Sequence, residues 1–166
     1  MDNNQQYYSL PQPQELTVRE CEDAMGAYLM MFASIGAGLP LPIINLIAAV
    51  VYYYINKSNS RFVRFHSLQS LLSQIPLTLL NAVAVFWTVR ILFYNSFTFS
   101  DNYIGYILML VLANLIYFIF SIIGAVKARK GRFYYFVFFG KVAYESVYRI
   151  KTETEIPEII NKPPNL

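Results

Sequence analysis

The sequence predicts an all-α, multi-pass helical membrane protein with about four membrane-embedded helical segments. Hydrophobic residues make up 56% of the 166 residues and charged residues 14%, whereas ordinary soluble domains contain roughly 45–50% and about 25%. Three stretches, 24–56, 65–89 and 102–126, contain no Asp, Glu, Lys or Arg. Each is longer than the roughly 20 apolar residues that a helix needs to cross a bilayer. The aromatic content of 17% also fits, because large amphipathic rings are enriched at membrane interfaces.

The first charge-free stretch is interrupted and predicts a short helical hairpin. Thr17 is followed three residues later by Glu20, which is the spacing of a capping box at the start of a helix. Glycine and proline, which both weaken helices, then gather in Gly36–Pro42. Two structures fit this pattern: helices near 18–36 and 41–56 that meet at the turn, or one kinked span. We favour the hairpin because of the two prolines, although an arm of about 15 residues reaches only about 23 Å.

Two longer helices are predicted after the hairpin. Residues 57–66 form a basic loop, and residues 67–93 form a helix that Pro76 should bend. A polar turn at 95–102 follows, and residues 103–126 form an uninterrupted apolar span. Both helices are long enough to cross a membrane.

The C-terminal part does not predict another span. Residues 133–139 are almost all aromatic but too few to cross, so we expect them to lie in the membrane interface or to dip into the bilayer. An amphipathic segment continues from there to Arg149. Both ends of the chain contain few apolar residues that could be buried, and this composition predicts that they are disordered. The expected organisation is therefore a disordered tail at 1–16, a helical membrane domain at 17–150 and a disordered tail at 151–166.

The positions of the cations predict the orientation in the membrane. The segment 57–64 contains three Lys or Arg and the segment 127–132 contains four. Two helices separate these segments, so both lie on one side, and the positive-inside rule makes that side the cytoplasm. With a hairpin at the start, both termini are cytoplasmic. The first 20 residues lack the pattern of a cleavable signal peptide, and we expect the bacterial cytoplasmic membrane as the location.

One face of the 67–93 helix continues a polar stripe that begins just before it. Uncharged polar side chains recur there at steps of three or four residues, which places them on one side of a helix. The stripe and its flanking residues are His66, Gln69, Ser70, Ser73, Gln74, Thr78 and Asn81. Such side chains either join neighbouring helices, at about 0.6 kcal/mol for each hydrogen bond, or line a hydrophilic groove. Both alternatives stay open, and Asn45 and Asn114, isolated in the first and third charge-free stretches, are natural partners for either.

No residue pattern points to catalysis, a cofactor or a metal ion. His66 is the only histidine and Cys21 the only cysteine, which is too few for a zinc site built from these ligands. Phosphate-binding loops and hydrolase motifs are missing from the sequence. We therefore predict that the protein is not an enzyme and binds no cofactor. Because His66 lies close to Arg61 and Arg64, we expect it to contact lipid headgroups or to cap the helix.

The sequence around His66 resembles a known family. Phe62, Arg64, Phe65 and His66 resemble the Phe-x-Arg-Phe-His signature of the Tic-twenty-like family, and Gln69 fits its bacterial form. Plastid members belong to the protein-import translocon of the chloroplast inner envelope, and many bacterial relatives are small membrane proteins. The resemblance implies four membrane-embedded segments, two cytoplasmic termini and a role connected with protein translocation.

Two functions follow as expectations. The first is a protein-translocation or import component that binds polypeptide along the polar stripe. The second is a non-transporting scaffold or accessory subunit of a larger membrane complex, because the apolar stretches carry no buried charge and Gly124 and Ala128 form a small-residue face for helix packing. The expected partners are the lipid bilayer, other membrane proteins or a second copy of the chain, and a translocating polypeptide. We expect no nucleic-acid partner, because the cations lie beside apolar stretches.

Overall fold

The computed structural model describes residues 7–33, 42–58, 60–94 and 99–150. Within these ranges the protein is all-α, as predicted, and contains no strand beyond an isolated bridge between Tyr7 and Arg149. The elements are α1 (Val18–Leu29), the short 3₁₀ helix η1 (Met30–Phe32), α3 (Pro42–Asn56), α4 (Arg61–Tyr94), α5 (Asp101–Arg129) and α6 (Phe139–Tyr148).

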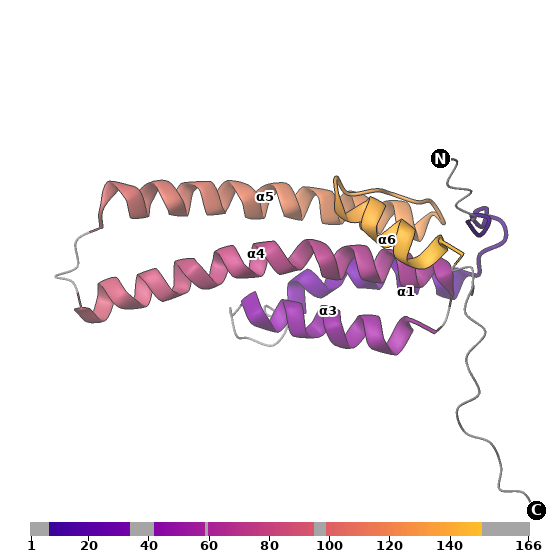
Figure 1. Ribbon diagram of the computed structural model, residues 1–166, viewed down its shortest axis with the longest axis horizontal. Coiled ribbons are helices and arrows are strands. Elements are labelled where there is room, and N and C mark those ends of the chain that lie inside the picture. Colours follow the sequence, from indigo (N-terminus) through magenta and orange to yellow (C-terminus); the bar gives the residue numbers. More distant parts are fainter. Residues whose placement is uncertain (1–6, 34–41, 59, 95–98, 151–166) are drawn as a thin grey trace, which may run out of the picture.

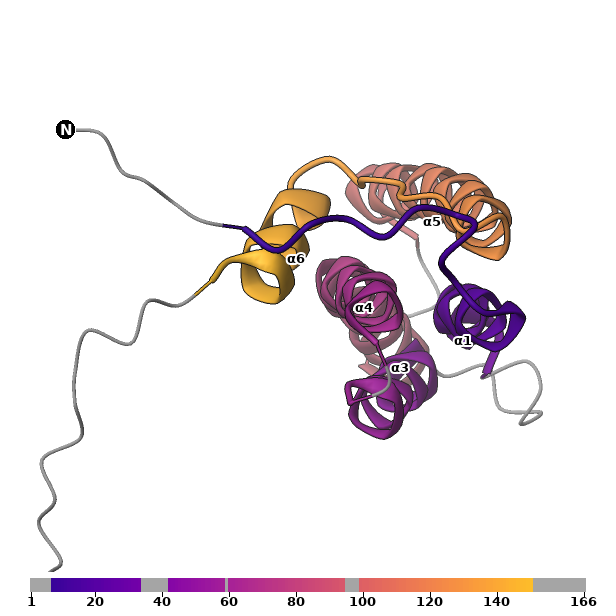
Figure 2. The same cartoon turned by 90° about the vertical axis from the view of Figure 1, so that its right-hand side faces the viewer.

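Two long helices form the frame of the molecule. Figure 1 shows α4 and α5 side by side over the whole length of the bundle, while α1, α3 and α6 accompany only the half in which α4 begins. Figure 2, which looks along the bundle, shows α1, α3, α5 and α6 arranged around α4. We call the end at which α4 begins and α5 finishes the basic end, because the cations of both predicted basic segments lie there.

The long helices have the properties of membrane spans. α4 has 34 residues and α5 has 29, so they measure about 51 Å and about 44 Å, more than the roughly 30 Å of a hydrocarbon core. Only 17% of the most apolar window of each helix is buried inside the protein. A core helix of a soluble protein would be mostly buried, so this exposed apolar surface is suited to lipid.

The remaining helices are too short to span a membrane individually. α1 has 12 residues and α3 has 15, or about 18 Å and about 22 Å. Two of the four predicted membrane-embedded segments therefore qualify as complete spans, and the structure does not establish that the other two are embedded. The helix lengths support two complete spans, and the embedding of α1 and α3 stays a prediction.

The first two helices are antiparallel neighbours. The Tyr52 hydroxyl, in the second half of α3, donates a hydrogen bond of 2.8 Å to the Asp23 carbonyl in the middle of α1. A single kinked span would keep these two residues far apart, so the contact favours the hairpin. The predicted turn at Gly36–Pro42 lies outside the described residues, except for Pro42, which is the first residue of α3.

Two predicted boundaries can be compared with the structure. The capping box is present, since Glu20 N–H donates to the Thr17 hydroxyl and Thr17 N–H donates to the Glu20 carboxylate. In contrast, α4 begins at Arg61 rather than at residue 67, because the Ser60 hydroxyl accepts a hydrogen bond from Val63 N–H and caps the helix earlier. The predicted basic loop is therefore shorter, and Pro76 lies within one continuous helix.

Residues 7–16 pack on the bundle instead of forming part of a disordered tail. In Figure 2 this segment crosses the basic end from α6 to α1. Tyr8 N–H donates to the Tyr148 carbonyl at 2.9 Å, the Tyr7 ring stacks on Tyr144, and the Arg61 guanidinium lies 3.6 Å from the centre of the Tyr8 ring. Tyr7 and Tyr8 thus contact side chains of α6 and α4, and no local sequence pattern reveals these contacts. The rest of the predicted tails, residues 1–6 and 151–166, lies outside the described residues.

Candidate functional site

The polar stripe of α4 faces the interior of the bundle. Nearly all of its side chains are buried, with at most 8% of their surface exposed: His66, Gln69, Ser70, Ser73, Gln74 and Thr78. Asn81, at the end of the stripe, is partly buried. The stripe therefore meets α1, α5 and the segment before α6, and it does not line an open groove. Of the two alternatives that the sequence left open, helix packing matches this geometry.

Tyr28 of α1 is the centre of a buried hydrogen-bond network. Its hydroxyl lies 2.8 Å from His66 Nδ1 and accepts a hydrogen bond of 2.7 Å from Gln69 Nε2. Since the Gln69 amide donates, the one hydroxyl proton of Tyr28 is available for His66 Nδ1. The sequence did not single out Tyr28, because one tyrosine in an apolar helix carries no periodic signal.

Gln69 also supports the backbone that follows α5. Its Nε2 donates to the Tyr134 carbonyl at 2.9 Å, and its Oε1 accepts from Phe136 N–H at 3.1 Å. The side chain thus supplies the hydrogen bonds that a neighbouring strand would otherwise provide to an extended segment. Irregular backbone at membrane depth is tolerated only where its polar groups are satisfied within the protein. Gln69 supplies that satisfaction here with one N–H group and its carbonyl oxygen, while its second N–H group donates to the Tyr28 hydroxyl.

The segment held by Gln69 reverses direction along the bundle, and because of this reversal we call residues 132–148 the re-entrant hairpin. Figure 1 shows the chain turning back from the end of α5 along the bundle, after which α6 returns to the basic end. The turn comes at Phe138, whose φ of 67° is rare for a residue other than glycine. Gly140 follows against Gln69, and a Cβ there would lie 2.8 Å from Gln69 Oε1. Residues 133–139 thus pack against α4, and their position in the membrane interface or within the bilayer stays a prediction.

Aromatic rings enclose His66. The ring centroids of Phe62, Phe65 and Phe133 lie 4.5, 5.0 and 5.8 Å from that of His66, which is fully buried. The expectation that His66 contacts lipid headgroups or caps the helix was therefore wrong: its helical position turns it inward, towards Tyr28. Arg64, in the same motif, is exposed.

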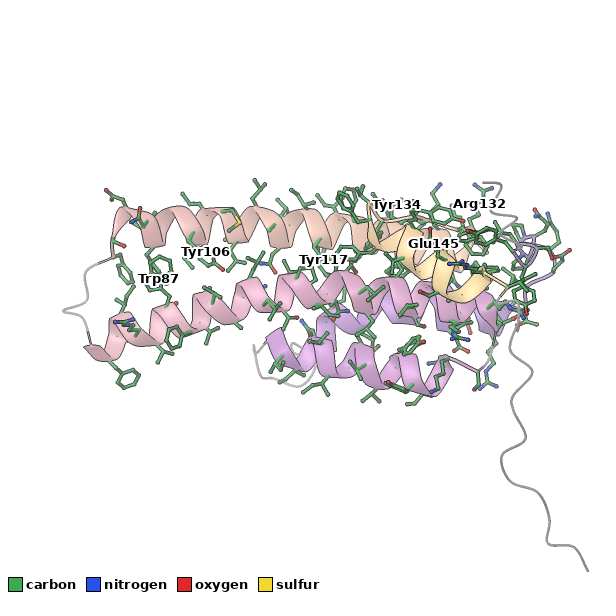
Figure 3. All side chains as sticks on the ribbon, viewed as in Figure 1. Trp87, Tyr106, Tyr117, Arg132, Tyr134 and Glu145 are labelled. Carbon is green, nitrogen blue, oxygen red and sulfur yellow. The ribbon has the colours of Figure 1, made fainter. Side chains whose placement is uncertain are left out.

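A second group of polar atoms lies deeper between α4 and α5. The Gln74 amide and the hydroxyls of Tyr117 and Ser121 are buried and have no hydrogen-bond partner among the described residues. Figure 3 shows Tyr117 between the two long helices. Unpaired buried polar groups each cost about 1–3 kcal/mol, so this layer is the least satisfied part of the stripe.

Beyond this layer, contacts between α4 and α5 join the two long helices. Asn81 and Asn114 exchange two hydrogen bonds of 3.3 Å, as the sequence suggested for Asn114. The Tyr106 hydroxyl donates to the Leu80 carbonyl at 2.7 Å, and Figure 3 shows Tyr106 and Trp87 between the helices. In this half, large side chains therefore fill the space between α4 and α5, and their hydrogen bonds connect the two helices.

The small-residue face of α5 is occupied within the chain. Gly124 lies against the Tyr28 ring, where an added Cβ would be 2.9 Å from a ring carbon, and Ala128 is fully buried. The predicted packing role fits these contacts. The idea that this face receives a partner of the scaffold complex does not fit, because α1 already covers it.

Charged groups gather at the basic end and pair in part. Arg129 forms an ion pair of 3.0 Å with Glu22, which ties the end of α5 to α1. The backbone N–H of Thr17 donates to the Glu20 carboxylate and lowers the pKa of Glu20 from its ordinary value. The described part of the chain holds no group of three or more His, Cys, Asp or Glu side chains that could hold a metal ion.

Comparison with family models identifies one match. Residues 22–142 match the model of the magnetosome magnetite crystal formation protein family. The chain belongs to this family. The matched region runs from the second turn of α1 to the first turn of α6 and so contains the buried network and the tip of the re-entrant hairpin. A search of curated proteins and a search of solved structures found no match.

The match corrects the family suggested by the sequence motif. The resemblance to the Tic-twenty-like family was wrong, and nothing in the match supports protein translocation. The motif was misleading because Phe62, Phe65, His66 and Gln69 are buried packing residues in the structure. Residues that hold a helical bundle together reveal little about what the bundle does.

Proposed function

We propose that the protein is an integral membrane component of magnetite crystal formation in magnetosomes. The observation that carries this proposal is the family match over residues 22–142, which coincides with the helical bundle rather than with a tail. A role in crystal formation would therefore reside in the membrane-embedded bundle. The proposal assigns no catalytic step and no iron ligand.

In this proposal the basic end faces the cytoplasm and the opposite end faces the magnetosome interior. The positive-inside rule supports this orientation, since Lys57, Arg61 and Arg64 lie with the cations at the end of α5. Residues 7 and 149 are joined at the same end by an isolated bridge, which supports placing both termini on one side. α1 and α3 would enter the membrane from the cytoplasmic side as a hairpin that does not cross it.

Gene replacement tests the role in crystal formation. A magnetite-forming bacterium that lacks its own members of this family would receive this chain, and crystal number and size would be measured by electron microscopy. We expect the wild-type chain to change the crystals, and Gln69→Leu, which removes the support of the re-entrant hairpin, to do so less at equal abundance. Crystals that are identical with and without the membrane-inserted wild-type chain would refute the proposal.

Cysteine labelling tests the orientation separately. In a Cys21→Ser background, Ser58→Cys marks the basic end and Ser100→Cys marks the opposite end, and both serines are exposed. In intact cells of an ordinary bacterial host, a membrane-impermeant maleimide should label Ser100→Cys and should label Ser58→Cys only after the membrane is permeabilised. The reverse pattern would show that the orientation is inverted.

A further inference from the structure

The protein has a larger cross-section at its basic end than at its opposite end. Around the first half of α4, the described residues include α1, α3, α6 and the second half of α5 (Figure 2). Phe32, the last residue of η1, packs against Phe118 with ring centroids 5.8 Å apart. Phe118 lies about 16 Å before the end of α5, so α1 and η1 reach less than halfway along that helix.

The opposite half is a pair of helices. Beyond the start of α3, the helices α4 and α5 lie beside one another, and Figure 1 shows no third described helix there. Their outward apolar side chains are strongly exposed, as in Phe86, Phe93 and Leu108. Lipid must therefore approach this pair more closely than it approaches the basic half.

The additional volume lies within one leaflet. Gln69 is five residues beyond Arg64 on α4, so the hairpin backbone that it holds lies about 8 Å below that cation. The tip of the hairpin projects from the protein, with 71% of Val137 and 81% of Phe138 exposed. Apolar side chains of interfacial helices enter the bilayer to about 5–10 Å. The exposed Lys141, one turn later, can extend its ammonium group to the headgroups.

From this distribution we infer that the protein is a membrane wedge that favours bilayers curved convexly towards its basic end. α1, α3 and the re-entrant hairpin expand the leaflet at that end, while the opposite leaflet accommodates only α4 and α5. A leaflet that is already expanded by curvature accepts the extra volume at a lower free energy, as it does for amphipathic helices inserted at the interface. This inference rests on the transmembrane placement and is independent of the role in crystal formation.

Sorting between vesicles of different diameter tests the wedge. The full chain, with Cys21→Ser and a fluorophore on Ser58→Cys, would be reconstituted into a mixture of small and large vesicles of one lipid composition. Protein density per membrane area would be measured vesicle by vesicle, and an external quencher would separate the two orientations. Molecules with the basic end outward should be several-fold denser on small vesicles, and inverted molecules should be depleted there. Equal sorting of both orientations, or none, would overturn the inference.

Two matched variants locate the cause of the sorting. Phe138 at the re-entrant tip and Phe93 near the end of α4 are exposed to 81% and 79%, so replacing each with alanine removes the same ring from opposite ends. The small-to-large density ratio should fall for Phe138→Ala and should stay equal or rise for Phe93→Ala. Equal losses in both variants would show that exposed rings, and not the shape of the molecule, cause the sorting. Helical content and elution in detergent would confirm that both variants fold.

Discussion

The two halves of the bundle differ in how they are held together. In the basic half, buried side chains of α4 bond to Tyr28 of α1 and to the re-entrant backbone, within a dense group of aromatic rings. In the opposite half, the two spans meet through an asparagine pair and a few tyrosine hydroxyls. The comparison teaches that a helical bundle can concentrate its specific packing in one half and join the other half by contacts between only two helices.

Removal of the Gln69 amide should produce the largest difference between the halves. Gln69→Leu leaves the Tyr134 carbonyl and Phe136 N–H without their partner and removes a donor to Tyr28. We expect a loss in the free energy of unfolding on the order of 3 kcal/mol, because several buried polar groups become unpaired at once. Denaturant unfolding in detergent micelles would measure it.

The matched change in the opposite half is Asn81→Leu. It removes the exchange with Asn114 in a partly buried position, for which about 0.6 kcal/mol is typical. Equal losses for the two leucine variants would contradict the view that specific packing is concentrated in the basic half.

A pair of glycine substitutions should produce a difference of intermediate size between the two halves. Gly124→Val in the basic half places a side chain against the Tyr28 ring, where even a Cβ would be 2.9 Å away. We expect a loss of about 1–3 kcal/mol from overpacking. Gly105→Val in the opposite half meets no atom within 4 Å of its Cβ, so the melting temperature should stay equal or rise slightly. A similar loss at both positions would mean that helix propensity, and not contact with α1, decides the outcome.

The smallest expected effect is a pH dependence at the start of α1. Thr17 lowers the pKa of Glu20, so this carboxylate stabilises the folded protein above its unfolded-state pKa and loses that contribution as the pH falls through the folded-state pKa. Glu20→Gln should therefore cost about 0.5 kcal/mol near neutral pH. The difference from wild type in melting temperature should shrink in acid. A difference that stays constant down to about pH 3 would show that the carboxylate charge is irrelevant to the cap.

Composition and spacing alone determined the class of this protein and its long helices. Charge-free stretches long enough to cross a bilayer predict helices, because in hydrocarbon the backbone N–H and C=O groups can form hydrogen bonds only with one another. The capping box at Thr17 and the inward-facing pattern of the polar stripe are also local, since helical geometry fixes which residues share a face. The predicted turn at Gly36–Pro42 followed from the same local chemistry, and the contact between Tyr52 and Asp23 agrees with it.

Only the tertiary structure decided what the polar residues do. The sequence assigned His66 to the lipid interface and Gly124 to a packing face with no identified partner, whereas Tyr28 of a separate helix contacts both. It also gave no sign that Gln69 holds the backbone at Tyr134, 65 residues away. The physical reason is that a hydrogen bond between distant segments depends on how helices pack, and a local pattern records the face of a helix but not the neighbour that covers it.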